Sequence, residues 1–170
     1  MRSTLRLSTG AILALTSLAW NEASSAPWLP ATMSLDRASV YEAALAPSEP
    51  DQIFAITVGW GLYRSEDQGD SWTDLTQNLP ADRVLEAIAI SPNDPNFLLL
   101  GGERPTTDTV LLLRSIDGGD SWSETSTGIE GRRVTALAFH PLDPSVVYAG
   151  TGWADPSGVY RSEDAGSTGL

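Results

Sequence analysis

The sequence has 170 residues, with 22 acidic side chains against ten basic ones, and its net charge is −12 at pH 7. So acidic a chain suits neither nucleic acids nor anionic membrane surfaces, and we expect neither as a partner. Cysteine is absent, so no disulfide framework is expected and packing alone must stabilise the fold.

The first 26 residues have the pattern of a secretory signal peptide. Arg2 and Arg6 precede a mostly apolar run from Ala11 to Trp20, and a stretch of small residues ends at Ala26. The apolar run is short for a transmembrane anchor. We therefore predict a signal peptide over residues 1–26, no membrane insertion after its cleavage, and a secreted or periplasmic protein. A retained N-terminal anchor is the alternative.

The rest of the chain is organised by a recurring phrase of eight residues. It reads SEDQGDSW at residues 65–72 and SIDGGDSW at residues 115–122, and its first part returns as SEDAG at residues 162–166. The aspartates of successive copies are 50 and then 47 residues apart. A period of about 40–50 residues is typical of the four-stranded blade of a β-propeller.

Each repeat begins with an apolar strand that ends at a turn with two prolines. This first strand has no polar face, so we predict that it is buried on both sides, close to the propeller axis. A second strand follows the proline turn, a third follows a variable loop, and the recurring phrase leads into a fourth. The second strands are expected at residues 53–56, 97–100 and 146–149, and the third at residues 61–64, 111–114 and 158–161.

This pattern predicts an all-β fold of about three blades, each a four-stranded antiparallel meander, in an incomplete or open propeller. The expected propeller segment covers residues 27–170, divided into a stray outer strand (27–40), a blade (41–83), a second blade (84–133) and a partial blade (134–170). Trp28 stands 19 residues before Pro47, as Trp122 does before Pro141, so the segment is expected to begin inside a fourth strand. Three blades cannot close a ring. We favour a fragment of a larger propeller, and the alternatives are self-association that closes the ring and an open solenoid.

The phrase S-x-D-x-G-x-x-W on a hairpin resembles the Asp-box, or BNR repeat. The resemblance covers nearly all of the chain after residue 26 and implies the Asp-box β-propeller group, which includes sialidases, xyloglucanases, sortilin-like receptors and photosystem II assembly factors. The phrase P-x-D-P-x-x-V-Y-A-G-T at residues 141–151 is most similar to the xyloglucanases and assembly factors. The resemblance is specific for the fold and not for an activity, because one fold hosts many functions.

We interpret the residues of the box as structural. A carboxylate there can accept hydrogen bonds from turn amides, glycine supplies a positive φ, and tryptophan packs on the hairpin. A calcium loop is the alternative, but the box lacks oxygen ligands at alternate positions, so no metal is predicted. The structural set is Ser65, Asp67, Gly69, Trp72, Ser115, Asp117, Gly119, Trp122, Ser162, Asp164 and Gly166.

Three arginines, Arg64, Arg114 and Arg161, share one repeat position just before the box. Sialidases bind a carboxylate with three arginines, but a residue repeated at one position serves each blade in turn, so we predict structural ion pairs. His140 precedes a turn proline, and we expect a surface or capping role for it. No phosphate-binding or metal-binding motif occurs, so no cofactor is expected.

A binding site is expected at the end of the blades where the variable loops lie. In a meander, the connections from second to third strand and from fourth to first share one end, and these connections differ between repeats. The candidate binding residues are Trp60, Trp153, Arg104 and Asp108, and the candidate catalytic carboxylates are Asp155 and Glu103. The alternative is that both tryptophans only cover the ends of the blades.

These observations favour an exported, non-catalytic propeller module that binds a protein or a glycan. The first alternative is a glycoside hydrolase of sialidase or xyloglucanase type, active only as a complete propeller. The second is a protein similar to photosystem II assembly factors. Whether the chain is an enzyme stays open, although the missing catalytic set argues against it.

Overall fold

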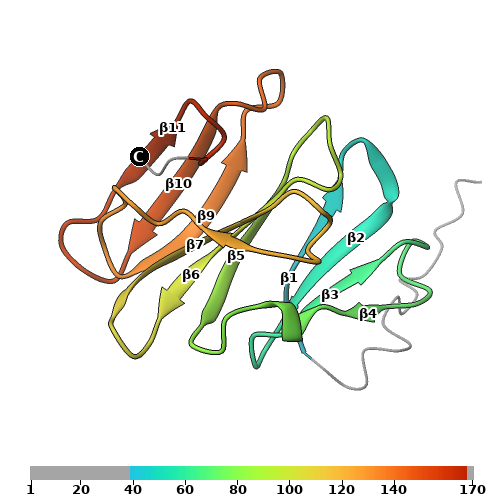
Figure 1. The fold of residues 1–170 in the computed structure, drawn as a ribbon, viewed down its shortest axis with the longest axis horizontal. Coiled ribbons are helices and arrows are strands. Elements are labelled where there is room, and N and C mark those ends of the chain that lie inside the picture. Colours follow the sequence, from blue (N-terminus) through green and yellow to red (C-terminus); the bar gives the residue numbers. More distant parts are fainter. Residues whose placement is uncertain (1–38, 168–170) are drawn as a thin grey trace, which may run out of the picture.

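The computed structural model describes residues 39–167, which form three antiparallel sheets packed side by side (Figure 1). The first sheet contains β1 (Val40–Ala46), β2 (Glu49–Thr57), β3 (Leu62–Ser65) and β4 (Thr73–Asp74). The second contains β5 (Val84–Ile90), β6 (Leu98–Arg104), β7 (Thr109–Ser115) and β8 (Ser123–Glu124), and the third contains β9 (Arg133–Phe139), β10 (Val147–Gly152) and β11 (Val159–Ser162). A single 3₁₀ turn, η1 (Thr76–Asn78), separates β4 from β5.

Neighbouring strands in each sheet are consecutive in the sequence, so each sheet is a meander. The predicted all-β fold with propeller-like blades is therefore confirmed, and within the described residues the sheets form an open arrangement. We call the three sheets the first, second and third blade. The expected signal peptide and residues 27–38 of the expected outer strand lie outside the described residues.

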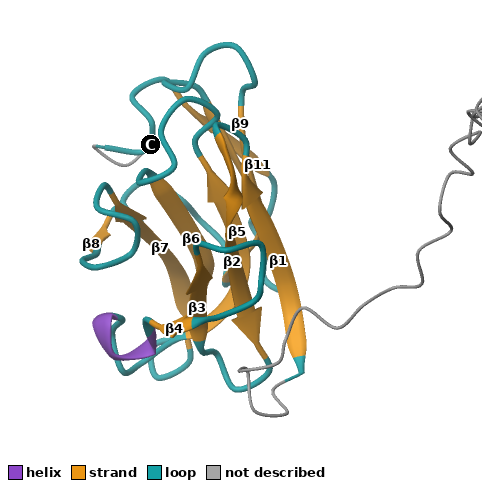
Figure 2. Ribbon diagram, turned by 90° about the vertical axis from the view of Figure 1, so that its right-hand side faces the viewer, coloured by secondary structure: helices purple, strands orange, loops and turns teal. Residues whose placement is uncertain are grey.

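The core lies between the blades. Side chains of the first blade, among them Phe54 and Leu62, pack against Leu98, Leu100 and Leu111 of the second. The opposite face of the second blade packs on the third in the same way, and the buried residues there are Leu99, Val110, Leu112, Ile129, Val134, Val147 and Ala149. Figure 2 shows the strands of the three blades running in roughly the same direction.

The first strands differ in burial. Strand β5 lies between β1 and β9, and six of its seven residues are buried, as predicted. The same prediction is wrong for β1 and β9, because each has an exposed face. Leu45 lies on the exposed face of β1, and Ala138 lies on that of β9. Burial on both sides requires a blade on each side, and within residues 39–167 only the second blade has two neighbours.

The recurring phrase forms the same hydrogen-bonded turn each time, and we call these three segments the serine–aspartate turns (residues 65–72, 115–122 and 162–167). In the second turn the Ser115 hydroxyl donates to Asp117 Oδ1 at 2.7 Å and accepts the Gly119 amide at 2.9 Å. The Ser121 amide donates to the same carboxylate at 2.9 Å, and the Trp122 indole donates to the Gly119 carbonyl at 3.0 Å. Gly119 has a φ of +91°, which glycine adopts without strain.

Corresponding bonds form in the other two turns. Asp67 Oδ1 accepts the Ser65 hydroxyl at 2.8 Å, and Asp164 Oδ1 accepts the Ser162 hydroxyl at 2.6 Å. Each aspartate is thus held inside its own hairpin, and the three lie in three different blades. These contacts give the recurring aspartates a local role in closing turns.

We expect stability to fall at acidic pH because of these turns. Hydrogen bonds from Ser121 and Ser115 lower the pKa of Asp117 from 3.8 to about 2, and similar bonds lower the pKa of Asp67. A carboxyl whose pKa is lower in the folded state stabilises the fold above its unfolded value, and this contribution is lost as the pH falls from 3.8 to about 2. Urea unfolding across that range measures the loss. The Asp117→Asn variant should show a shallower decline, and an equal decline in both proteins would contradict this role.

Candidate functional site

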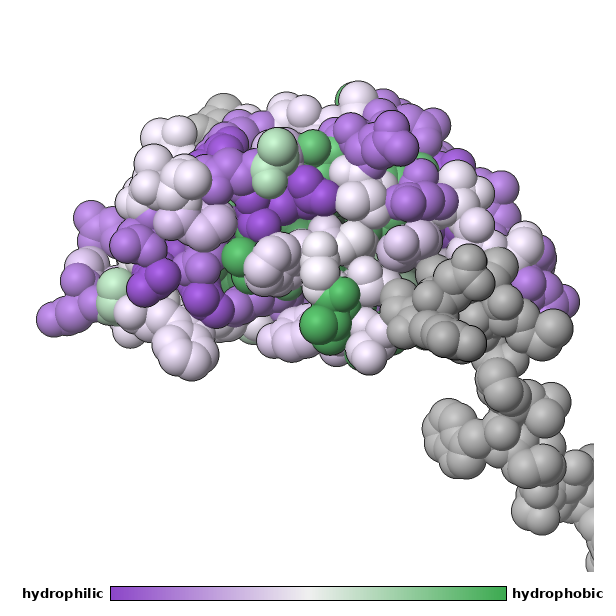
Figure 3. All heavy atoms as spheres, turned by 90° about the horizontal axis from the view of Figure 1, so that it is seen from below, coloured by the Kyte–Doolittle hydropathy of each residue, from purple (hydrophilic) through white to green (hydrophobic). Residues whose placement is uncertain are grey.

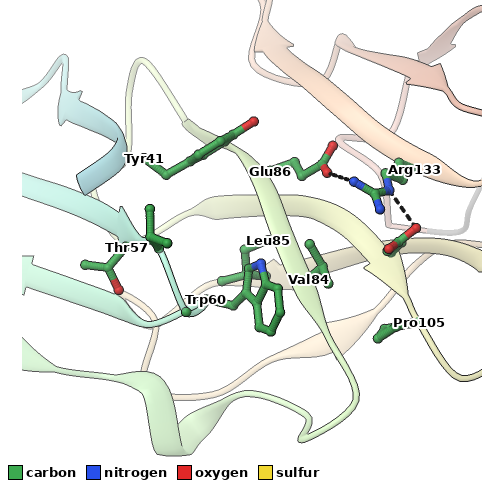
Figure 4. A pocket seen from close by; sticks show the side chains of 11 residues that line it. Tyr41, Thr57, Trp60, Val84, Leu85, Glu86, Pro105 and Arg133 are labelled. Carbon is green, nitrogen blue, oxygen red and sulfur yellow. Dashed lines mark hydrogen bonds and ion pairs between the residues drawn. The ribbon is translucent and has the colours of Figure 1, made fainter. Parts of the chain in front are cut away.

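A pocket of about 580 Å³ opens between the first and second blades, at the end where β1, β5 and β9 begin (Figure 4). We call this end of the blades the loop end. The pocket is lined by Tyr41, Thr57, Val58, Gly59, Trp60, Val84, Leu85, Glu86, Glu103, Pro105 and Arg133. Figure 3 looks onto the molecule from below, and strongly hydrophilic residues lie beside a few hydrophobic ones on that face.

Irregular strand pairing brings unlike side chains to the loop end. In each blade the pairing of the first strand with the second shifts by one residue near its start, at Tyr41, Glu86 and Thr135. Such a bulge changes the direction of a side chain and is common beside binding sites. Two of the three bulge residues, Tyr41 and Glu86, line the pocket. A structural irregularity that repeats in every blade thus carries residues that do not repeat.

Both candidate tryptophans stand on strained loop backbone. Trp60 has a φ of +64° and Trp153 a φ of +70°, in the left-handed region that bulky residues rarely adopt. Strain of this kind costs on the order of 1–3 kcal/mol and is found mostly at functional sites. Trp60 is 46% exposed and lines the pocket, and Trp153 is 75% exposed. Neither tryptophan is buried in the core.

A chain of ion pairs runs along one side of the pocket. Arg133 donates to Glu86 and, through Nε at 2.7 Å, to Glu103 Oε2, as the dashed lines in Figure 4 show. Arg132 Nε donates to the same Glu103 oxygen at 2.9 Å, and its Nη2 lies 2.7 Å from Asp108 Oδ1. The Arg133 guanidinium also lies 5.2 Å from the Trp153 ring centroid. Charges of alternating sign therefore connect the start of β5, the end of β6 and the start of β9.

This arrangement holds its charges in place. Hydrogen bonds from Arg133 to Glu103 and Glu86 raise the pKa of the guanidinium, which keeps it charged. Two guanidinium groups occupy one oxygen of Glu103, whose side chain is nearly inaccessible to solvent. Glycoside hydrolysis needs one carboxyl that delivers a proton and a second that attacks or activates water. Glu86 and Glu103 instead share one guanidinium, so the geometry suits recognition of a ligand better than proton transfer.

The candidate residues named from the sequence are only partly brought together. Glu103, Asp108 and Trp153 meet through Arg132 and Arg133, and Trp60 lies in the same pocket as Glu103. Glu103 belongs to β6 and not to a loop, and only 2% of it is exposed.

The other two candidates lie apart from this group. Arg104 pairs with Glu124 at 2.5 Å, and this hydrogen bond lowers the pKa of Glu124. Asp155 lies exposed between β10 and β11. Within residues 39–167 no group of three or more His, Cys, Asp or Glu side chains could hold a metal ion.

Sequence reasoning missed Glu86, Arg132, Arg133 and Tyr41. The adjacent arginines were a usable signal, because the chain has only ten basic residues and these two stand directly before a predicted first strand. His140, by contrast, caps its proline turn as expected, where Nδ1 accepts the Asp143 amide at 3.1 Å. The described residues contain no helix long and apolar enough to cross a bilayer.

Comparison with known proteins places this fold among β-propellers. No family model matches the chain. One curated relative, the dispase autolysis-inducing protein of Streptomyces mobaraensis, is 26% identical over 130 residues. The match covers 67% of this chain and 34% of that protein, so the chain spans about a third of the length of this relative.

Among solved structures, the GH74 enzyme of Niastella koreensis matches with a TM-score of 0.58 and 23% identity, over 76% of this chain and 22% of that one. YCF48 bound to D1 peptide matches with a TM-score of 0.56 and 20% identity, over 76% of this chain and 39% of that one. The GH74 xyloglucanase of Xanthomonas campestris gives 0.55 and 21%, over 72% and 20%. These neighbours are β-propeller proteins, and at such identities they establish the fold alone.

Proposed function

We propose that this chain is an exported segment of an Asp-box β-propeller that binds an extended peptide or protein segment at the loop-end pocket. The observation that carries the proposal is the pairing of exposed aromatic rings with charges that are already neutralised. Tyr41, Trp60 and Pro105 offer apolar walls, while Arg133 and its two carboxylates form a fixed polar side. Specific pockets combine an apolar lining with a few oriented polar groups in this way.

Two of the relatives support a protein ligand. YCF48 has been solved with a bound peptide, and the curated relative is named for inducing autolysis of a protease. The bound peptide shows that YCF48 engages a polypeptide. The Asp-box assignment is supported by the serine–aspartate turns, which recur in all three blades with the same hydrogen bonds.

Replacement of Trp60 by alanine should weaken peptide binding about tenfold, because aromatic side chains that become buried on binding contribute most to the affinity. Peptides selected from a random display library against the purified chain are the probe, and calorimetric titration gives their affinities. Leu142→Ala is the control, since this exposed residue lies in the β9–β10 turn, away from the pocket. Equal affinities for wild type and Trp60→Ala would reject the pocket as the peptide site.

The GH74 neighbours make a carbohydrate ligand the second candidate. Xyloglucan oligosaccharides that bind in a Trp60-dependent manner, with no selected peptide binding, would establish this alternative. Their hydrolysis, abolished by Glu103→Gln or Asp155→Asn, would establish a glycoside hydrolase. A role similar to that of photosystem II assembly factors predicts instead a membrane-protein segment among the bound peptides.

A further inference from the structure

The three blades form an open row with two outer faces, one on the first blade and one on the third. The residues on these outer faces are equivalent to residues that pack between the blades. In the second strand, Phe54, Leu99 and Tyr148 occupy the same repeat position, and the first two are fully buried against the next blade. In the third strand the equivalent residues are Leu62, Leu112 and Val159, of which only Val159 is strongly exposed. The outer face of the third blade therefore presents the same positions that the first two blades use to contact their neighbours.

The complementary face belongs to the first blade. Ile90 on β5 and Phe139 on β9 occupy one repeat position and pack against the preceding blade. Their equivalent in the first blade is Leu45, which is exposed. The third blade thus exposes the face that the first two blades use to contact the blade after them. The first blade exposes the face that the other two use to contact the blade before them.

A polar contact joins the first blade to the second. Arg64 Nη1 donates to the Gly118 carbonyl at 2.9 Å and lies 3.6 Å from Asp120 Oδ1, both in the serine–aspartate turn of the following blade. Arg64 also pairs with Glu66, two residues further along its own chain. This contact joins Arg64, which directly precedes the first serine–aspartate turn, to the second serine–aspartate turn.

Arg161 has half of this arrangement. It pairs with Glu163 just as Arg64 pairs with Glu66, but no following blade exists within the described residues to supply the rest. The residues equivalent to Gly118 and Asp120 in the first blade are Gln68 and Asp70. Asp70 is exposed, and no ion pair within residues 39–167 involves it. One face thus carries an arginine lacking its partner across the interface, and the other carries the matching carboxylate.

We propose that the first blade of a second copy of this chain docks on the third blade, with Arg161 binding the Gln68 carbonyl and the Asp70 carboxylate across the interface. The contact is head to tail, so it continues until a ring closes. Propellers have about four to eight blades, and six is the only multiple of three in that range. Six blades require two copies of the three described blades, so two copies are the expected number.

Sedimentation equilibrium of the purified chain tests the proposal. The expected result is a monomer–dimer equilibrium in which Arg161→Glu and Asp70→Arg each weaken association on the order of 30-fold, as loss of a buried interface ion pair does. The double variant Arg161→Glu with Asp70→Arg should recover most of the affinity, because it restores the pair with its charges exchanged. Glu130→Arg is the matched control for charge alone and should leave association unchanged.

Circular dichroism of each variant confirms that it is folded, and all of these substitutions are at exposed positions. A folded monomer at the highest soluble concentration overturns the proposal, and would mean that other blades or another protein cover these faces. A dimer that withstands both single variants overturns it too. This inference does not depend on the ligand of the loop-end pocket, since Trp60→Ala should leave association intact.

Discussion

Replacement of Gly102 by alanine is expected to destabilise the fold by at least about 3 kcal/mol. An added Cβ would lie 1.8 Å from the carbonyl oxygen of Val84 and 2.9 Å from its carbonyl carbon. Both atoms belong to the backbone of β5, so no side chain can rotate to make room. Strands β5 and β6 would have to separate beside the Glu86 bulge, and overpacking that moves backbone lies at the costly end of its range.

Urea unfolding followed by tryptophan fluorescence measures this effect. Gly158→Ala is the matched control, because no atom lies within 4 Å of its added Cβ and its change should stay within about 0.5 kcal/mol. Gly101→Ala should fall between the two, since its Cβ would meet the Val134 side chain at 2.5 Å, and a side chain can partly adjust. If Gly102→Ala unfolds at the same urea concentration as Gly158→Ala, the two strands are not as close as described. The substitution should also displace residues of the pocket, because Val84 and Glu103 line it.

The repeat made the blades predictable from the sequence. A residue at a given repeat position faces the same direction in each blade, so the order of strands and the serine–aspartate turns follow from local patterns. The cross-blade contact of Arg64 was predicted only as a structural ion pair, because a single repeat contains no information about which turn of the next blade it meets. The same repeat position does not make the same contact in every blade, because Arg114 lies 4.6 Å from the ring centroid of Phe97 in its own blade.

The candidate site was less predictable, and Glu103 shows why. Its segment was read as a loop, but the second blade has longer middle strands, and the pairing of Glu103 with Val110 and of Arg104 with Thr109 extends the ladder. The length of the loop between β6 and β7 depends on how far these two strands pair. The composition of the segment does not reveal the extent of that pairing. The partners of Glu103, Arg132 and Arg133, come from the next blade, so only packing of whole blades brings them together.

Burial differs within one repeat position, and this leads to the second large effect. Leu62, Leu112 and Val159 are equivalent, with exposed fractions of 0%, 4% and 77%. Leu62→Ala and Leu112→Ala should each cost about 2–5 kcal/mol, because each leaves a cavity between two blades. Val159→Ala should change the stability of the monomer by less than about 0.5 kcal/mol, because within residues 39–167 no following blade covers its side chain.

Urea unfolding at low protein concentration measures these three values. Equal losses at all three positions would contradict the described burial, and would mean that the third blade is covered even in the monomer. Repeating the series at high concentration adds a second argument. If a second copy covers this face, the stability of the wild type rises with concentration, and Val159→Ala then loses part of that gain. The difference in unfolding free energy between the two concentrations therefore separates the burial within one chain from the burial between two copies.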